Sequence, residues 1–447
     1  MRCIGLDVHR DFCEVAIAQD GKLRSAGRFS TDPDSVERWA GELQPDDLVT
    51  LEATGNALAI ARLIEPFAGV VLANPKAVKG ATALRTKTDK IDARTLATLL
   101  AGGFLPEVWI VDEATRILRR RISGRAHLVK ARTKVKNQVH AALIRNLKRP
   151  PVSDLFGVRG LAWLAEQELP DDERETVDAC LRQIAFLDHE IADLETKLAQ
   201  AVLISPDMRR LLTLPGVNSV TAAAFMAAVG DISRFPTPRH LVSYLGLNPR
   251  VHQSGSDKAR HGRITKQGPS DARHVLVEAA WRAGRETGPL RAFCQRVAAK
   301  RGPNIATVAV ARKLVVIAWH MLTRNEEYAF ARPSLVREKV RRLELLTGAE
   351  RHRGKRTGVF AQASQHDLER ELAAQAEIAY QRLVKDWAPR TEKGARAASG
   401  ARIFLTLSVN QRGRVRAPAL HFGSAISRTA ETMHLTTSCD KGLDFHP

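Results

Sequence analysis

Apolar and polar residues are arranged differently in the first 75 residues than in the rest of the chain. Short apolar segments rich in β-forming residues predict strands, and Asp20 and Gly21 predict a hairpin turn between the second and third of them. After the third strand, helix patterns separate the later strands. The predicted strands span 2–8, 12–18, 22–29, 48–52 and 69–74, and the predicted helices span 33–43 and 56–66. This order predicts a mixed sheet in which three antiparallel strands precede βαβ units.

The remaining chain has the pattern of helices. In residues 177–201 the apolar positions are separated by alternating steps of three and four, which predicts a coiled-coil seam. Such a seam needs a partner helix, either in a helical hairpin or in a second copy, and we expect a homo-oligomer, a dimer or tetramer. Beyond about residue 388 the periodicity is lost, so we expect a loosely ordered tail. The predicted domains are 1–110 with the sheet, 111–205 with basic helices and the coiled coil, 206–330, also mostly helical, and 331–447 with a basic helical extension and the tail.

Charge narrows the class of partner. The chain has 69 Lys and Arg against 49 Asp and Glu, a formal net charge of +20 over 447 residues. Such an excess predicts a polyanionic partner, either nucleic acid or an anionic membrane surface. No apolar run reaches the roughly 18 residues that cross a bilayer, and Asp7 and His9 stand where a signal peptide is apolar. We therefore expect a cytoplasmic, nucleoid-associated protein that binds DNA and no membrane.

The cysteines predict no structural metal site. They are scattered without paired or zinc-type spacing, which is typical of reduced thiols in a reducing compartment. The five are Cys3, Cys13, Cys180, Cys294 and Cys439.

Four acidic residues are candidates for a metal site. Asp7 lies in the first predicted strand, Glu52 ends the fourth, and Asp89 and Asp92 lie at the start of a predicted helix, three residues apart and so on one face. Carboxylates brought together repel one another unless a cation neutralises them, and two Mg²⁺ ions about 3.5–4 Å apart can hold a scissile phosphate. The alternative is structural: Asp89 could cap the helix, with Asp92 in its favourable first turn. Their joint placement, on a sheet ordered as in ribonuclease-H-like folds, favours the metal site.

Two regions are candidates for nucleic-acid binding. The predicted helix at 112–148 is very basic and has few acidic residues after Glu113, which favours contact with phosphates over a solvated face. The segment LLTLPGVNSV resembles a helix-hairpin-helix turn around Gly216, which either approaches a phosphate or serves packing alone. The candidate contacts are Arg119, Arg120, Arg121, Arg125, Lys130, Lys134, Gly216, Arg250, Lys258, Arg260, Arg263 and Lys266.

Ser254 is the candidate nucleophile. It lies in a Ser-Gly-Ser sequence among basic residues, and a cationic cluster can stabilise the charge that develops on phosphorus when a hydroxyl attacks it. A flexible loop is the alternative interpretation of such a sequence, and Ser256 is the second choice for the nucleophile.

These segments resemble a known family. GLDVHRDFCEVAI, LEATG and NPKAVKGATALRTKTDKIDARTLA look like the conserved blocks of DEDD transposases of the insertion sequence 110 family, whose N-terminal domain is similar to the RuvC junction resolvase. Gly246, Pro249, Gln253-Ser254-Gly255, Ile264-Thr265-Lys266 and Gly268 look like its C-terminal signature. The resemblance implies that Asp7, Glu52, Asp89 and Asp92 bind Mg²⁺, that Ser254 joins DNA covalently, and that a structured RNA guides the enzyme.

Three other interpretations stay open. A junction nuclease would activate water with the acids and use Ser254 only to bind phosphate. A non-catalytic nucleic-acid-binding protein would use the basic surface alone. An actin-like sugar kinase would explain GLDVHRDFCEVAI as a phosphate hairpin, but the chain has no second glycine-rich phosphate loop and its charge is wrong for a small-molecule enzyme.

Overall fold

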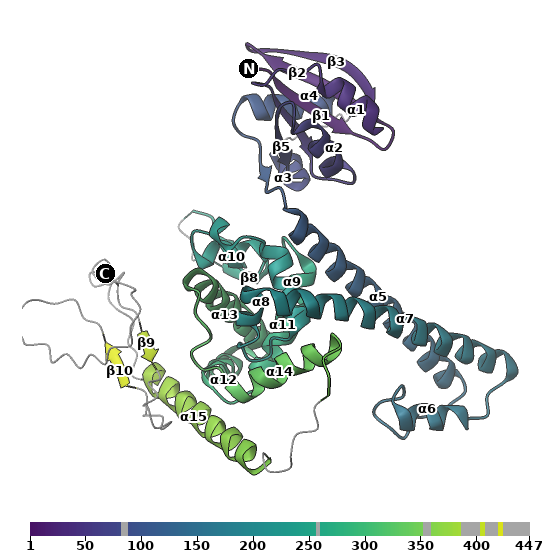
Figure 1. Ribbon diagram of the computed structural model, residues 1–447, viewed down its shortest axis with the longest axis vertical. Coiled ribbons are helices and arrows are strands. Elements are labelled where there is room, and N and C mark those ends of the chain that lie inside the picture. The colour runs from purple at the N-terminus through teal and green to yellow at the C-terminus, as the bar shows by residue number, and fades with distance from the viewer. Residues whose placement is uncertain (82–87, 256–259, 352–358, 386–402, 407–418, 423–447) are drawn as a thin grey trace, which may run out of the picture. The chain divides into compact units, whose positions relative to one another are not determined.

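The computed structural model describes residues 1–81, 88–255, 260–351, 359–385, 403–406 and 419–422. The chain divides into two compact units, Met1–Arg116 and Ile117–Pro447. The first contains a sheet with helices, and the second is mostly helical (Figure 1).

The first unit is built on a six-stranded mixed sheet. Its order is β3-β2-β1-β4-β5-β6, in which β1, β4 and β5 are parallel and the other neighbours are antiparallel. The strands are Cys3–Val8 (β1), Phe12–Gln19 (β2), Lys22–Ser30 (β3), Leu48–Glu52 (β4), Gly69–Ala73 (β5) and Glu107–Val108 (β6). Asp20 and Gly21 have positive φ between β2 and β3, as the hairpin turn requires. The mixed α/β sheet predicted from the sequence is confirmed, and the short edge strand β6 is an addition to it.

Different residues cover the two faces of the sheet. On one face, Leu6 and Leu51 are buried under α1 (Pro33–Ala40) and α2 (Ala57–Ile64). On the other face, α4 (Asp89–Ala101) lies close to β1 and β2. A Cβ atom on Gly5 would collide with the carbonyl oxygen of Ala93, so this glycine allows α4 to approach β1. A further short helix, α3, spans Pro75–Ala81.

The second unit contains a long helical hairpin. Its two arms are α5 (Glu113–Arg145) and α7 (Asp171–Ile204), and α6 (Val158–Ala165) lies in the connection. Ion pairs join the arms in antiparallel order, namely Arg125–Glu195, Arg132–Asp188 and Arg145–Glu173. The basic helix therefore has acidic partners after all, and they come from α7, which the pattern of α5 alone does not show.

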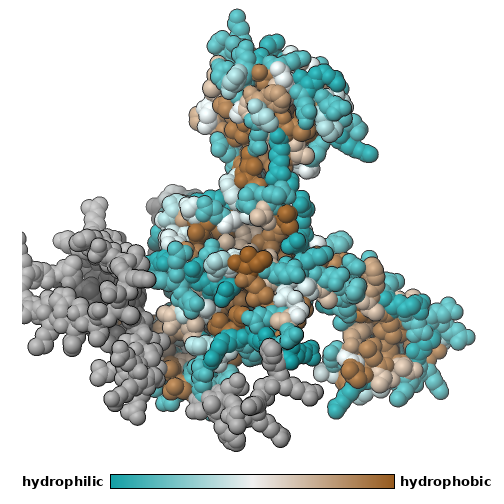
Figure 2. All heavy atoms as spheres, viewed as in Figure 1, coloured by the Kyte–Doolittle hydropathy of each residue, from teal (hydrophilic) through white to brown (hydrophobic). Residues whose placement is uncertain are grey.

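The heptad positions of α7 are buried or half-buried within the chain. Val177, Cys180 and Ile184 form one apolar cluster with Val139 and Leu143 of α5. Of the two partners expected for the seam, the structure contains the helical hairpin, and whether a second copy also binds stays a prediction. Figure 2 shows apolar surface around α6 at the end of this hairpin.

A helical body completes the second unit. Its core forms around α13, which packs against α8, α10, α11 and α12. The helices are α8 (Pro206–Leu211), α9 (Ser219–Val229), α10 (Pro238–Tyr244), α11 (Ser270–Ala283), α12 (Pro289–Arg301), α13 (Pro303–Arg324) and α14 (Pro333–Leu346). Among the described residues, α13 alone is long and apolar enough to cross a membrane, although Arg312 and Lys313 interrupt its apolar run. Half of its apolar stretch is buried in the protein.

The helix α15 (Val359–Lys385) joins this body through two buried glutamates. Glu377 accepts a hydrogen bond of 2.9 Å from the backbone N–H of Gly288 at the start of α12. Glu369 accepts one of 3.1 Å from the backbone N–H of Ser334 in the first turn of α14. Each carboxylate satisfies a backbone donor that a helix N-terminus leaves without an intrahelical partner. The extension predicted at 331–447 is thus helical in α14 and α15.

Two short strands, Ile403–Thr406 (β9) and Ala419–Phe422 (β10), pair antiparallel within the segment predicted to be a loosely ordered tail. The rest of that segment lies outside the described residues.

Candidate metal centre and nucleic-acid interface

Two of the four candidate acids lie at the same edge of the sheet. Leu6 of β1 is in register with Leu51 of the parallel strand β4, so the next residues, Asp7 and Glu52, are neighbours at the carboxyl ends of these strands. Because side chains alternate along a strand, both belong to the face opposite Leu6 and Leu51, which is the face that α4 covers. Asp7 and Glu52 are half-buried there.

The other two acids lie in the first turn of α4. Thr88 caps this helix, since its hydroxyl accepts a hydrogen bond of 3.3 Å from the N–H of Ile91. Asp89 and Asp92 follow in the first turn. Burial raises the pKa of Asp7, His9 opposes that shift, and the negative charges of Asp92 and Asp89 add to it. Three of the acids predicted from the sequence are therefore close together, and the backbone register puts Glu52 beside Asp7.

His9 is a site residue that the sequence analysis missed. Its Nε2 atom lies 3.1 Å from Oδ2 of Asp7 and 3.3 Å from Oδ1 of Asp89. These three ligand atoms lie within 4.8 Å of one another, a separation at which one metal ion can bind all of them. The signal in the sequence is the Asp-x-His spacing at the end of a strand, where residues two apart project to the same side.

Glu14 is a second acid that the sequence analysis missed. It is paired with Asp7 across β1 and β2, so the two side chains belong to the same face. Its side chain is buried, and Arg28 donates a hydrogen bond to it. Arg28 thereby neutralises this charge, and Glu14 needs no metal ion for that purpose.

Ser254 lies at the exposed end of a β-hairpin in the second unit. The strands β7 (Pro249–His252) and β8 (Arg260–Ile264) pair antiparallel, and Ser254 and Gly255 follow the first of them. Four of the candidate basic residues are exposed on this hairpin or directly after it, namely Arg250, Arg260, Arg263 and Lys266. The candidates Ser256 and Lys258 lie outside the described residues.

Two glycines of the segment that resembles the family signature, Gly246 and Gly268, lie at the base of this hairpin. A Cβ atom on Gly246 would collide with the backbone of Gln267, and one on Gly268 with the carbonyl oxygen of Tyr244. Both glycines have positive φ, which other residues rarely adopt. Arg273 donates hydrogen bonds of 3.1 Å to the carbonyl oxygens of Leu245 and Gln267. These residues therefore position the hairpin that carries Ser254, whereas Ser254 itself has no such structural role among the described contacts.

The turn that resembles a helix-hairpin-helix packs against α11. Gly216 has a φ of +73°, and a Cβ atom there would collide with the carbonyl oxygen of Ala279. Asn218 then caps α9 by accepting a hydrogen bond of 2.8 Å from the N–H of Thr221. Packing thus accounts for Gly216, and its contact with nucleic acid stays a prediction.

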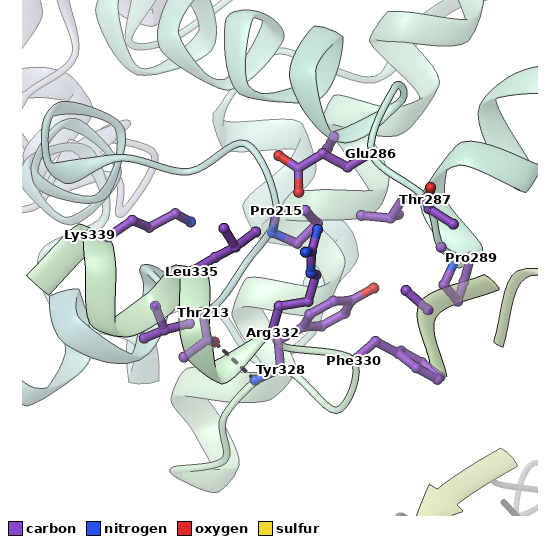
Figure 3. A pocket seen from close by; sticks show the side chains of 15 residues that line it. Thr213, Pro215, Glu286, Thr287, Pro289, Tyr328, Phe330, Arg332, Leu335 and Lys339 are labelled. Atoms are coloured by element: carbon purple, nitrogen blue, oxygen red, sulfur yellow. Dashed lines mark hydrogen bonds between the residues drawn. The ribbon is translucent and has the colours of Figure 1, made fainter. Parts of the chain in front are cut away.

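A lysine from α14 holds the same turn. Nζ of Lys339 donates hydrogen bonds of 2.8 and 3.0 Å to the carbonyl oxygens of Leu212 and Leu214. The N–H of Tyr328 donates to the hydroxyl of Thr213 at 3.1 Å, and the side chains of Lys339, Glu286 and Tyr328 line a pocket beside Pro215 (Figure 3). Residues beyond 325 therefore take part in fixing the turn.

The contribution of Lys339 to stability should depend on pH. Burial lowers its pKa to about 8, whereas the pKa of an unfolded lysine is about 10.4. Between these values the unfolded chain binds more protons than the folded one, so the free energy of unfolding rises with pH in this window. From pH 7.5 to 10.5, the free energy of unfolding of the unaltered protein should rise relative to that of Lys339→Met, by about 3 kcal/mol at most. Urea unfolding of both proteins measures this change. A difference that is constant over this range would contradict the lowered pKa.

Two of the basic residues predicted to bind nucleic acid have partners within the chain. Arg119 donates hydrogen bonds of 2.6 and 3.2 Å to the carbonyl oxygens of Ala227 and Ala228 at the end of α9, where a cation is favourable. Arg125 is paired with Glu195. These contacts give both side chains a structural role, and their part in nucleic-acid binding stays a prediction.

The outward side of α5 has a basic stripe, which we define as Arg120, Lys130 and Lys134. All three are exposed, and their spacing puts them along one side of the helix with His127. Arg121 is half-buried. The side chains of this stripe are accessible from solvent.

Two family models match the chain. One for the DEDD transposases of IS110 elements matches residues 4–146, which include all four candidate acids. The other, described as the transposase IS116/IS110/IS902 family, matches residues 208–295, which include Ser254. The two matches coincide with the two regions that carry the candidate chemistry.

Individual proteins that are similar to this chain include transposases and a gene-inverting protein. A putative transposase, y4qE, of Sinorhizobium fredii is 29% identical over 288 residues, which are 62% of this chain and 70% of the relative. The transposase of insertion sequence element IS1111A of Coxiella burnetii is 29% identical over 254 residues, 54% of this chain and 68% of the relative. The pilin gene-inverting protein of Moraxella bovis is 27% identical over 256 residues, 55% of this chain and 69% of the relative. With both of its functional regions matched in order, the chain belongs to the IS110 family of transposases.

Proposed function

We propose that this transposase cuts and rejoins DNA with a metal centre made by Asp7, Glu52, Asp89 and Asp92 and with Ser254 as the nucleophile. The observation that carries the proposal is the convergence of Asp7, Asp89 and Asp92 on one side of the sheet, with Glu52 in the neighbouring register position. The order of the six strands supports a RuvC-like, ribonuclease-H-like assignment of the first unit.

The carboxylates suit Mg²⁺, which binds oxygen ligands and commonly keeps substrate phosphates in its shell. A bound divalent cation supplies charge stabilisation at the scissile phosphate. The side chains of Asp7 and Asp89 are 19% and 41% exposed, so both carboxylates are accessible from solvent. Removal of divalent cations with a chelator should abolish strand cleavage and leave binding of DNA in place.

An ester between Ser254 and the DNA would conserve the energy of the broken phosphodiester bond. Its hydroxyl oxygen attacks the scissile phosphorus, the bond from phosphorus to the leaving sugar oxygen breaks, and that oxygen takes up a proton while the serine loses one. The resulting phosphoserine ester can be attacked by another strand end, which restores the serine.

A junction nuclease that uses water is the second candidate function. It would use the same acids, and the exposed hairpin with Arg250, Arg260 and Arg263 would bind phosphate only. A covalent protein–DNA adduct after denaturation separates the two functions, because hydrolysis leaves none.

A guide RNA is also proposed as a partner. The basic stripe of α5 suits the phosphates of a structured RNA and of duplex DNA alike. Purification of the protein from its host, followed by sequencing of any discrete RNA that comes with it, tests this partner. Cytoplasmic, nucleoid-associated localisation and a homo-oligomeric state belong to the same proposal, and light scattering on the full chain tests the latter.

Binding of nucleic acid should depend steeply on salt because of this stripe. Each phosphate contact contributes about 0.9 to the slope of log K against log salt on duplex DNA. We expect Lys130→Gln with Lys134→Gln to make the slope shallower by up to about 1.8, as measured by fluorescence anisotropy at several salt concentrations.

The matched control replaces two other exposed lysines, Lys300→Gln with Lys313→Gln, on α12 and α13. An equal change of slope in both double variants would mean that the stripe of α5 is not a specific contact surface.

A further inference from the structure

The position of His9 between two metal-binding carboxylates has a chemical consequence. Its Nε2 atom is 3.1 Å from Oδ2 of Asp7 and 3.3 Å from Oδ1 of Asp89. Two ligand atoms at right angles, each about 2.1 Å from an ion, lie roughly 3.0 Å apart. Both separations are therefore compatible with one ion that binds the two carboxylates and the imidazole nitrogen together.

Hydrogen bonds from a protonated imidazole to the carboxylates would have the same separations. When a divalent cation binds, however, the ring must either present its lone pair to the ion or leave the space between Asp7 and Asp89. The structure restricts the second option. The backbone N–H of His9 donates a hydrogen bond of 2.9 Å to the backbone carbonyl oxygen of Phe12. The imidazole ring packs against the ring of Phe12, with the ring centroids 4.7 Å apart.

The backbone on the other side of His9 is held as well. Nδ2 of Asn56 donates to the carbonyl oxygen of His9 at 3.4 Å, and Asn56 follows β4 by four residues. The turn that carries His9 is thereby tied to the segment that follows Glu52. The held backbone, together with the ring contact with Phe12, favours the position of the imidazole beside the carboxylates.

We propose that Nε2 of His9 is a direct ligand of the divalent cation, together with Asp7 and Asp89, and that it shifts the preference of the centre from Mg²⁺ toward Mn²⁺. This inference rests on the metal centre of the proposed function. Carboxylate oxygens suit Mg²⁺ and Mn²⁺, whereas an imidazole nitrogen suits transition metals. Loss of the nitrogen should therefore weaken Mn²⁺ binding more than Mg²⁺ binding.

Pulsed electron paramagnetic resonance of the full chain with one equivalent of Mn²⁺ tests the ligand directly. The spin echo should be modulated by a ¹⁴N nucleus. Labelling the histidines with ¹⁵N should replace the ¹⁴N modulation with that of ¹⁵N. His9→Gln should remove the nitrogen modulation, whereas His127→Gln, at an exposed position on α5, should leave it unchanged. His9 is the only histidine in residues 1–116, so no neighbour in that unit can substitute for it.

Calorimetric titration gives the second measurement. We expect His9→Gln to lower the ratio of Mn²⁺ to Mg²⁺ affinity by about tenfold or more. Circular dichroism and thermal unfolding of the metal-free variant check that the fold is kept.

The outcomes separate the inference from the function on which it rests. Suppose that Mn²⁺ binds the unaltered protein without nitrogen modulation and no longer binds Asp7→Asn. This result would overturn the role of His9 and support the carboxylate centre. Nitrogen modulation that survives His9→Gln would overturn it too. Mn²⁺ binding that Asp7→Asn does not weaken would remove the metal centre itself.

Discussion

Asp7→Asn is expected to reduce DNA strand cleavage by roughly 10³-fold or more, the size of effect seen when one member of a catalytic group is removed. The amide keeps the shape of the side chain but loses the negative charge between His9 and the first turn of α4. A divalent cation then loses a ligand at the centre of the site. Cleavage of a labelled duplex that contains the element's ends measures the effect.

Binding of DNA should be nearly unchanged in this variant, since we expect binding to depend on Lys and Arg and not on Asp7. Asp11→Asn is the matched control, because Asp11 lies in the neighbouring turn and its side chain is 84% exposed. We expect it to cleave normally. Normal cleavage by Asp7→Asn would disprove the metal centre.

The second large effect is expected for Ser254→Ala, which should abolish the covalent protein–DNA adduct and with it strand exchange. The physical reason is that strands can be rejoined without an external energy source only if the energy of the broken phosphodiester is conserved in an ester to the protein. Ser254 is exposed at the end of the β7–β8 hairpin, so its removal should leave the fold intact. The reaction is run on a labelled DNA substrate that is nicked or mismatched, so that adducts accumulate. The protein is then denatured, and an adduct is detected as label that stays on the protein.

Ser256→Ala is the closest control, and it should retain the adduct. If the adduct survives Ser254→Ala and is lost in Ser256→Ala, the nucleophile is Ser256. Variants that all cut DNA without any adduct would favour the junction nuclease.

The sequence alone determined the features that depend on local chain geometry. Short apolar segments rich in β-forming residues predicted the strands β1 to β5, and Asp20 and Gly21 predicted the turn between β2 and β3. Both signals are properties of a few adjacent residues. The pairing of Asp89 with Asp92 in one helical turn was predictable for the same reason. The four acids and Ser254 were also identified by resemblance. One family model covers the four acids, and the other covers Ser254.

Only the tertiary structure decided which groups meet across the chain. The acids of α7 that pair with Arg125 and Arg132 lie more than 50 residues away in sequence, so the basic pattern of α5 could not reveal them. The heptad pattern of α7 predicted that a partner helix exists, but an apolar seam is compatible with any complementary helix, and the antiparallel packing of α5 supplies it.

The same reason explains the residues whose roles the sequence analysis missed or left open. Gly216 is required by the close approach of α11, 63 residues later, and not only by its own turn. His9 has an ordinary place in a short turn after β1, and it joins the candidate site only because α4 packs onto the sheet at Gly5 and brings Asp89 to it. Periodicity and turn chemistry indicate which secondary structure each segment forms. Contacts between distant segments depend on how their surfaces pack together, and a local sequence pattern does not contain that information.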